Sequence, residues 1–318
     1  MNTEQLYFGF LADGFVRDKA IFNLKHGRCG WVLCGGVKLP KRDIIECISD
    51  PDKEWRTIVT TSSSGKERVC FSPSPRLRIM QNRLARYLSW KARWEFGTPA
   101  EEGMKGTVII LPSFGFSRGD SIIRNAERHQ WNNSSLVLDL KDAFASIKTK
   151  HIFRFLKPSM GRNIAWVASR LLTYKGRLPQ GAPSSPRVFN MMMQKFDYAM
   201  RETSGVTYTR YGDDLCFSTK RAQFPKAAEK RIREIVENFH LRLNHKRKVG
   251  QNGILPLPGV RIVHGRIEPD IEALERWAEA IKENKPPEVL RGYESFLGQF
   301  SRSGRRYGRK RLATLVAA

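Results

Sequence analysis

The stretch that most constrains the fold of this chain is VTYTRYGDDLCFS, at residues 206–218. β-Branched and aromatic residues alternate with polar ones on both sides of Gly212, and this pattern predicts a β-hairpin. Asp213 and Asp214 lie at the predicted tip, where aspartate and glycine are also ordinary turn formers. Two adjacent carboxylates repel each other, however, so a divalent cation that neutralises both is the better explanation of this tip.

A third acid lies inside an apolar run, LVLDL at residues 136–140, which predicts a buried strand. An ionised Asp139 is costly there unless it is paired or binds a metal ion. Two Mg²⁺ ions about 4 Å apart, held by carboxylates, can activate an attacking hydroxyl and stabilise a leaving pyrophosphate. Asp139, Asp213 and Asp214 therefore predict a nucleotidyl-transfer site that uses two Mg²⁺ ions, with Mn²⁺ as a substitute.

The composition indicates a globular protein that binds nucleic acid. The chain has 318 residues, 41% of them hydrophobic, and its 56 lysines and arginines exceed its 31 acidic residues, for a net charge of +25. Such a surplus is typical of proteins that follow a phosphate backbone. Because no apolar run approaches the ~20 residues that span a bilayer, and MNTEQLYFGF lacks a signal-peptide pattern, we expect a cytoplasmic protein without a membrane partner.

The five cysteines are odd in number and contain no CxxC pair, which argues against a disulfide framework. A zinc site built from His26, Cys29, Cys34 and Cys47 is the less favoured alternative, since the spacing fits no common ligand pair. We expect reduced thiols.

The rest of the chain alternates between short strands and helices, so the predicted class is α+β. After a strand at residues 108–111, Asp120 is predicted to cap a helix that runs to His129, which we interpret as a packing residue. The other predicted elements are a strand at 66–71, a helix from 77, a loop at 178–186 leading into a helix, a helix from 226, a basic segment at 243–248, a short hairpin from 256, helices at 271–284 and 287–299, and a basic tail at 301–311.

In their order, three motifs resemble the palm motifs of reverse transcriptases. They are LDLKDAF at 138–144, LPQGAPSSP at 178–186 and YGDD at 211–214. Within that family the chain most resembles the retron-type bacterial enzymes, because NAERH at 125–129 is similar to their NAxxH signature. The resemblance covers roughly residues 60–300, and the VTG triplet of retron enzymes keeps only its glycine here, Gly259.

This resemblance implies a right-hand polymerase fold, with an N-terminal region and fingers at 1–105, a palm at 106–265 and a small helical thumb at 266–318. It also implies roles for individual residues. The catalytic acids are Asp139, Asp213 and Asp214, and they bind the metal ions together with the carbonyl of Leu140. The nucleotide-binding residues are Arg68, Phe144, Gln180 and Gly181, with Phe144 as a steric gate against a 2′-hydroxyl. The nucleic-acid-binding residues are Lys248, Arg302, Arg305 and Arg306, with Lys246 or Lys248 beside the leaving pyrophosphate.

The implied function is RNA-directed DNA synthesis from dNTPs. A retron-type enzyme copies a structured noncoding RNA into single-stranded DNA, primes from an RNA 2′-hydroxyl, and is linked to anti-phage defence through an effector or toxin encoded nearby. An orphan defence-associated or group II intron-derived reverse transcriptase is an alternative, as is an RNA-templated RNA polymerase. Phe144 disfavours the last, since a site that accepts ribose should offer a hydrogen-bonding group there. A third alternative is a polymerase-derived scaffold that only binds RNA. Such a protein would be expected to have lost one of the three carboxylates, and all three are present here.

Overall fold

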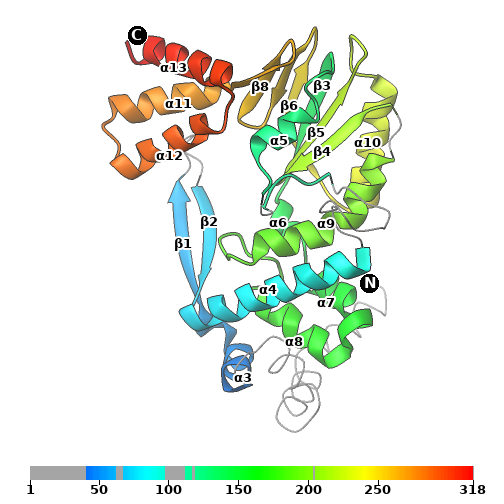
Figure 1. Cartoon of the computed structure of the whole chain (residues 1–318). Coiled ribbons are helices and arrows are strands. Elements are labelled where there is room, and N and C mark those ends of the chain that lie inside the picture. Colours follow the sequence, from blue (N-terminus) through cyan, green and yellow to red (C-terminus); the bar gives the residue numbers. More distant parts are fainter. Residues whose placement is uncertain (1–40, 62–66, 97–111, 117–118, 203–204, 318) are drawn as a thin grey trace. The chain divides into compact units, whose positions relative to one another are not determined.

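The structure is a computed structural model that describes residues 41–61, 67–96, 112–116, 119–202 and 205–317. The chain divides into two compact units (Figure 1): unit 1 consists of Met1–Ile109 and Phe144–Met192, and unit 2 of Ile110–Ala143 and Met193–Ala318. Both units combine helices with antiparallel strands, which confirms the α+β class. The strand predicted at 108–111 lies outside the described residues, as do three of the four proposed zinc ligands, His26, Cys29 and Cys34. The described cysteines, Cys47, Cys70 and Cys216, carry free thiols.

Unit 1 is mainly helical and carries one two-stranded antiparallel hairpin. Its elements are α3 (Lys41–Ser49), the 3₁₀ helix η2 (Pro51–Glu54), β1 (Trp55–Thr61), β2 (Glu67–Pro73), α4 (Pro75–Phe96), α7 (Thr149–Met160) and α8 (Arg162–Leu172). The short α6 (Ala143–Ser146) and the long α9 (Ser185–Arg201) each cross the boundary between the units. The predicted apolar stripe of α4 is confirmed, because Leu77, Met80, Leu84 and Leu88 are all buried.

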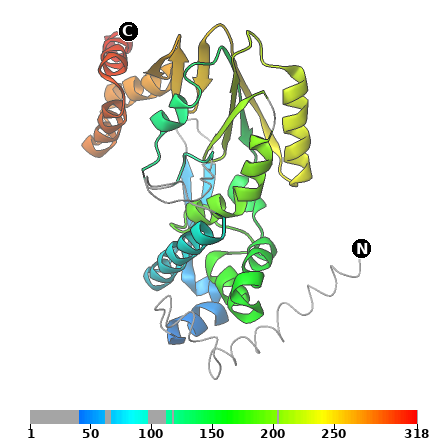
Figure 2. The ribbon, with the colours of Figure 1, turned by 45° about the vertical axis from the view of Figure 1, so that its right-hand side comes forward.

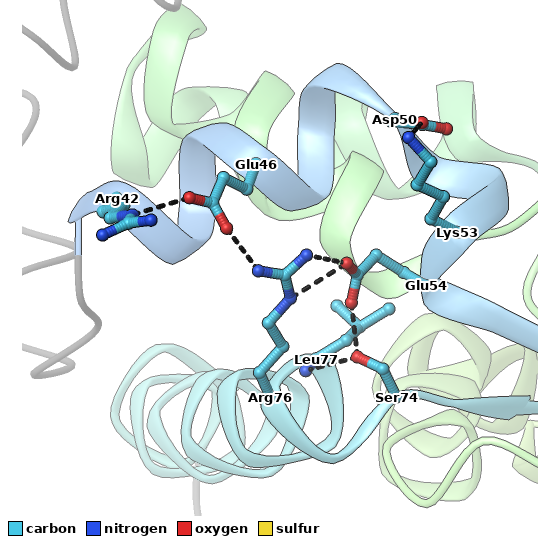
Figure 3. A network of polar contacts seen from close by, with 8 residues as sticks. All are labelled: Arg42, Glu46, Asp50, Lys53, Glu54, Ser74, Arg76 and Leu77. Atoms are coloured by element: carbon cyan, nitrogen blue, oxygen red, sulfur yellow. Dashed lines mark hydrogen bonds and ion pairs between the residues drawn. The ribbon is translucent and has the colours of Figure 1, made fainter.

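An ion-pair network surrounds the start of α4 (Figure 3). Ser74 precedes Pro75, the first helical residue, and its hydroxyl accepts a hydrogen bond from the Leu77 backbone N–H at 3.2 Å, so Ser74 is the N-cap. Glu54, which is buried, accepts hydrogen bonds from the Ser74 hydroxyl and from the Arg76 guanidinium, including Nε at 2.9 Å. Arg76 also pairs with Glu46 on α3. The network therefore joins α3, η2 and α4 into one block.

Unit 2 is built on a four-stranded antiparallel sheet with the strand order β4-β5-β3-β6. Its strands are β3 (Ser134–Leu140), β4 (Thr207–Tyr211), β5 (Asp214–Thr219) and β6 (Leu243–Gly250), and α10 (Lys226–Asn238) lies beside the sheet in Figures 1 and 2. The hairpin predicted at 206–218 and the buried strand predicted at 136–140 are both confirmed. The basic segment at 243–248 was not predicted to be a strand, and it becomes the edge strand β6 because it pairs with β3.

A three-stranded sheet and three helices complete unit 2. The strands are β7 (Ile254–Leu257), β8 (Val260–Val263) and β9 (Arg266–Pro269), and the helices are α11 (Ile271–Lys282), α12 (Pro287–Gly298) and α13 (Arg302–Ala317). The helices lie next to these strands in Figure 2 and share one apolar core with them. The segment predicted as a basic tail is thus the start of a folded helix, in which Gly304, Gly308 and Leu312 are buried.

The helix α5 (Ile122–Glu127) begins differently from the prediction. Its N-cap is Ser121, whose hydroxyl accepts a hydrogen bond from the Arg124 N–H at 3.2 Å; the prediction of Asp120 as the cap is wrong by one residue. Asp120 instead lies 3.9 Å from the Arg124 guanidinium. None of the helices in the described part of the chain has the length and apolar content that crossing a bilayer requires.

Candidate active site

The three predicted acids lie at one end of the four-stranded sheet. Asp139, near the end of β3, is paired directly with Asp214, the first residue of β5. Directly paired residues of antiparallel strands project on the same face, so these two carboxylates share a face. Asp213 lies in the turn between β4 and β5, and its carbonyl accepts a hydrogen bond from the Leu140 N–H at 3.0 Å. Antiparallel pairing thus brings together residues more than seventy positions apart in the sequence.

The electrostatics of this end are those of a cation site. Burial raises the pKa of Asp214 to about 7, together with the charges of Asp213 and Asp139, while Lys248 and Lys246 act in the opposite direction. The lysines therefore do not neutralise the negative charge that the fold has concentrated here. Such an excess of carboxylate charge in a partly buried place favours a bound divalent ion.

The donor atoms suit magnesium, which prefers carboxylate and carbonyl oxygens. Asp139, Asp213 and Asp214 supply such oxygens at one strand end, so the residues present fit the ion. In the described ranges no three His, Cys, Asp or Glu side chains form a closed metal-binding group, so these carboxylates do not converge on a single point. The Asp139 carboxylate has a protein partner of its own, because its Oδ2 accepts a hydrogen bond from Asn244 Nδ2 at 2.7 Å.

Asn244 is a neighbour of Asp139 that the sequence did not reveal. It lies on β6, and the basic composition of residues 243–248 gave no indication that this segment is a strand. Lys246 and Lys248 lie on the same strand. Lys248 forms ion pairs with Glu272 at 3.0 Å and with Asp270 at 3.7 Å, at the start of α11.

The three arginines predicted to bind nucleic acid lie near the start of α13. Arg302, Arg305 and Arg306 are exposed. Arg305 donates hydrogen bonds to the carbonyls of Gly298 and Phe300, at 3.2 and 3.3 Å, and so satisfies backbone groups at the end of α12.

The residues predicted to bind the nucleotide belong to unit 1. Arg68 is exposed on β2, paired with Thr60 of β1. The carbonyl of Gln180 accepts a hydrogen bond from the Phe71 N–H of the same strand at 2.7 Å. Gly181 has a positive φ of 98°, and an added Cβ would lie 3.0 Å from the Cβ of Cys70. A glycine is therefore required where this loop crosses β2, and the contact brings Gln180 and Gly181 to the strand that carries Arg68.

Phe144 lies in α6, and it is half-buried. Its ring centroid is 5.1 Å from that of Phe189 on α9, in a tilted arrangement, and Phe189 is fully buried. One side of the Phe144 ring therefore packs against the core of unit 1. The contact gives the ring a defined position, which a steric gate requires.

The NAERH segment packs against the hairpin of β4 and β5. His129 is fully buried, and its two ring nitrogens lie 2.6 Å from Ser218 Oγ on β5 and 2.7 Å from Thr209 Oγ1 on β4. Burial lowers the pKa of His129 to about 3, so the ring is neutral. Asn125, also buried, approaches Cys216 Sγ at 3.8 Å. The interpretation of His129 as a packing residue is confirmed: it ties α5 and its following turn to both strands of the hairpin.

The comparisons with known proteins agree with this geometry. The sequence profile of the family described as reverse transcriptase (RNA-dependent DNA polymerase) matches residues 50–251. The chain is 36% identical to the retron Ec86 reverse transcriptase of Escherichia coli over 140 residues, which are 42% of this chain and 43% of that protein. It is 30% identical to the retron Mx162 reverse transcriptase of Myxococcus xanthus over 222 residues, 59% of this chain and 43% of that protein. The chain thus spans less than half the length of these two relatives.

Among solved structures, the chain is similar to a telomerase from Candida albicans in complex with a fragment of telomeric RNA, with a TM-score of 0.47 and 10% identity over 71% of this chain and 50% of that one. An apo telomerase from Candida tropicalis has a TM-score of 0.44 and 12% identity, covering 71% of this chain and 59% of that one.

Proposed function

The chain belongs to the reverse transcriptase family, and we propose that it is an RNA-directed DNA polymerase of the retron type. The observation that carries the proposal is the pairing of Asp139 with Asp214 across β3 and β5, with Asp213 in the adjoining turn. A scaffold that only binds RNA has no need to concentrate three carboxylates at one strand end, because their repulsion destabilises the fold. The likeness to retron relatives supports the finer assignment.

The proposed metal ligands are the carboxylates of Asp139, Asp213 and Asp214 and the carbonyl of Leu140. Two Mg²⁺ ions, or Mn²⁺ in their place, would supply charge neutralisation for the attacking 3′-hydroxyl and for the leaving pyrophosphate. The chain itself contributes the alignment of the acids, since β-pairing sets Asp139 against Asp214 and the Leu140 N–H holds the backbone of Asp213. Lys246 or Lys248, both on β6, is proposed to neutralise the leaving pyrophosphate.

The incoming dNTP is proposed to contact Arg68, Gln180, Gly181 and Phe144. The loop that carries Gln180 and Gly181 is hydrogen-bonded to β2, the strand of Arg68, which supports one shared nucleotide surface. Arg68 is assigned to the triphosphate, because an exposed guanidinium can donate two hydrogen bonds to phosphate oxygens at once. Phe144 is assigned to the sugar, as the ring that excludes a 2′-hydroxyl.

The nucleic-acid partners in this proposal are a structured noncoding RNA and the DNA copied from it. The proposed division of the right hand assigns fingers to residues 1–105, palm to 106–265 and thumb to 266–318. In the thumb, the exposed Arg302 and Arg306 support contacts with RNA phosphates. Priming from an RNA 2′-hydroxyl, activity in the cytoplasm and a role in anti-phage defence with a partner effector complete the proposal.

The decisive experiment replaces one acid and leaves a matched neighbour as control. Asp213→Asn should lower primer extension on an RNA template by about 100- to 1000-fold, because charge stabilisation at the reacting phosphate is lost, whereas RNA affinity should stay unchanged. Asp142→Asn is the control: Asp142 is exposed, and its φ of 50° suits asparagine equally well. Extension by Asp213→Asn near the wild-type rate would refute the catalytic assignment.

The retron type is tested on the product. DNA purified from cells that express the chain with its native flanking sequence should carry a covalently attached RNA, so that ribonuclease treatment changes its mobility. Free DNA without an RNA branch would leave the polymerase assignment intact and exclude the retron type. Incorporation of rNTPs in preference to dNTPs would instead identify an RNA-templated RNA polymerase.

A further inference from the structure

A fully buried ion pair lies directly beneath the catalytic turn. Arg210 on β4 and Asp197 on α9 have 0% and 1% of their side-chain surface exposed. The guanidinium donates from Nε to Asp197 Oδ1 at 2.8 Å and from Nη2 to Asp197 Oδ2 at 2.7 Å. The Tyr208 hydroxyl donates to the same Oδ1 at 2.8 Å. Both carboxylate oxygens therefore have partners, and the planar fork of Arg210 has one orientation.

The same guanidinium also contacts the turn that carries the acids. Arg210 Nη1 donates a hydrogen bond at 2.9 Å to the carbonyl of Gly212, the residue before Asp213. The Arg210 backbone is held as well: its N–H donates to Pro112 O at 2.7 Å, and its carbonyl accepts from the Phe114 N–H at 2.8 Å. Arg210 thus has a fixed backbone, a fixed side chain and a donor aimed at the turn.

The segment that follows Phe114 also lies close to Gly212. A Cβ on Gly115 would lie only 2.6 Å from the Gly212 nitrogen, and a Cβ on Gly212 would lie 3.3 Å from the ring of Phe116. Phe116 has a φ of 67°, an uncommon conformation for a bulky residue. Gly212 is therefore in contact with the Arg210 side chain, with the Gly115 backbone and with the Phe116 ring.

Packing alone does not account for this arrangement. Burying an arginine and an aspartate removes both charges from water, and apolar residues of similar volume often stabilise a core as well or better. What apolar residues cannot do is donate a hydrogen bond to the Gly212 carbonyl. The hydrogen bond to the turn is therefore the feature that distinguishes this ion pair from an apolar core.

We propose that Arg210 is a positioning residue for the Asp213–Asp214 turn, acting through the carbonyl of Gly212, and that Asp197 sets its orientation. This inference rests on the proposed function of the two acids. The peptide between Gly212 and Asp213 begins with the carbonyl that Arg210 holds, so its rotation is restricted, and the direction in which the Asp213 side chain leaves the backbone is restricted with it. Asp197 on α9 in this way acts on the geometry of the acids through Arg210.

Three variants separate positioning from stability. Arg210→Lys keeps the charge opposite Asp197 but loses the rigid fork that reaches both Asp197 and Gly212. Tyr208→Phe is the matched control, because it removes a hydrogen bond from the same Asp197 without touching the turn. The combined variant Arg210→Met, Asp197→Leu, Tyr208→Phe replaces the whole buried group by apolar side chains. Each variant is assayed well below its own melting temperature for kcat, for the KM of dNTP, and for Mn²⁺ affinity by calorimetry.

Positioning predicts that Arg210→Lys lowers kcat and Mn²⁺ affinity by about 10- to 100-fold, with an unchanged KM for dNTP, whereas Tyr208→Phe leaves all three near wild type. The apolar variant should recover the melting temperature and still have a low kcat. Equal losses in Arg210→Lys and Tyr208→Phe, or wild-type kcat in the apolar variant, would overturn the proposal. If the apolar variant does not fold, the first comparison decides.

The Mn²⁺ measurement keeps this proposal separate from the proposed function. Wild-type protein that makes no DNA on any primed template would remove the polymerase assignment. A loss of Mn²⁺ affinity in Arg210→Lys and not in Tyr208→Phe would still show that Arg210 orders the acids.

Discussion

Gly115→Ala is expected to lower the proposed polymerase activity through backbone displacement. Gly115 has no positive φ, so alanine is allowed there by its own backbone. Its new Cβ, however, would lie 2.6 Å from the Gly212 nitrogen, 3.3 Å from the Tyr211 carbonyl carbon and 3.4 Å from the Gly212 Cα. All three atoms belong to the backbone, so no side chain can rotate away, and either the turn at Gly212–Asp214 or the 112–116 segment must move.

The displacement follows from these distances. Ordinary contact begins at 3.4 Å, so the two segments must separate by about 0.8 Å, the difference between 3.4 and 2.6 Å. Since a misplacement of about 1 Å can lower a rate about 100-fold, we expect kcat to fall by one to two orders of magnitude. The strain should also lower the free energy of unfolding by about 1–3 kcal/mol.

The assay is single-turnover extension of a primed RNA template, with urea unfolding of the same preparations. Gly292→Ala in α12 is the matched control: nothing lies within 4 Å of its added Cβ, and alanine in a helix is more stable than glycine by up to about 1 kcal/mol. A Gly115→Ala protein with wild-type kcat and stability would refute the close approach of residue 115 to the turn, and with it the contact of this segment with Gly212.

Three further predictions concern other parts of the chain. Phe144→Ala should admit ribonucleotides, and because the half-buried ring packs on Phe189 it should also lower the free energy of unfolding by about 2 kcal/mol; incorporation of rNTP against dNTP measures the first effect. Replacing Arg302 and Arg306 by glutamine should weaken RNA binding and flatten its salt dependence, by about 0.7 in the slope of log K against log salt for each phosphate that is no longer neutralised. The buried, neutral His129 should make the protein less stable in acid. Its pKa is about 3 in the folded protein and 6.5 in the unfolded chain, so below pH 6.5 the unfolded chain binds a proton that the folded protein does not. The contribution of His129 to the free energy of unfolding is therefore fully present above pH 6.5 and falls by about 1.4 kcal/mol per pH unit below it.

Each of these predictions has its own control. An unchanged dNTP preference in a folded Phe144→Ala protein would assign the ring to the core alone. Arg231→Gln, an exposed change on α10, should leave the salt dependence of RNA binding as it is, and an equal effect of Arg231 and the two thumb arginines would mean that only total charge matters. For His129, the difference in unfolding free energy between wild type and His129→Gln should change with pH between 5 and 6.5, and a constant difference would contradict a neutral buried ring.

Local patterns determined the elements of the site. The alternation on both sides of Gly212 and the apolar run around Asp139 are properties of neighbouring residues, because a strand with one buried face imposes a period of two on its own sequence. The hairpin, the strand β3 and the three acids were therefore predictable from the order of the residues alone. So was the packing role of His129, since an uncharged imidazole with hydrogen-bond partners is the commoner state of a buried histidine.

Only the tertiary structure decided which distant residues serve those acids. Residues 243–250 have no apolar alternation, and they form β6 because the edge of β3 offers them hydrogen-bond partners, which places Asn244 against Asp139 across 105 positions of sequence. In the sequence, Arg210 is one more polar residue of a strand and Asp197 an ordinary helical acid. Only the packing of α9 on the sheet brings the two side chains together. Burial then requires each charge to have a partner. The sequence encodes the charges, whereas the pairing between them arises only when folding removes the alternative partner, water.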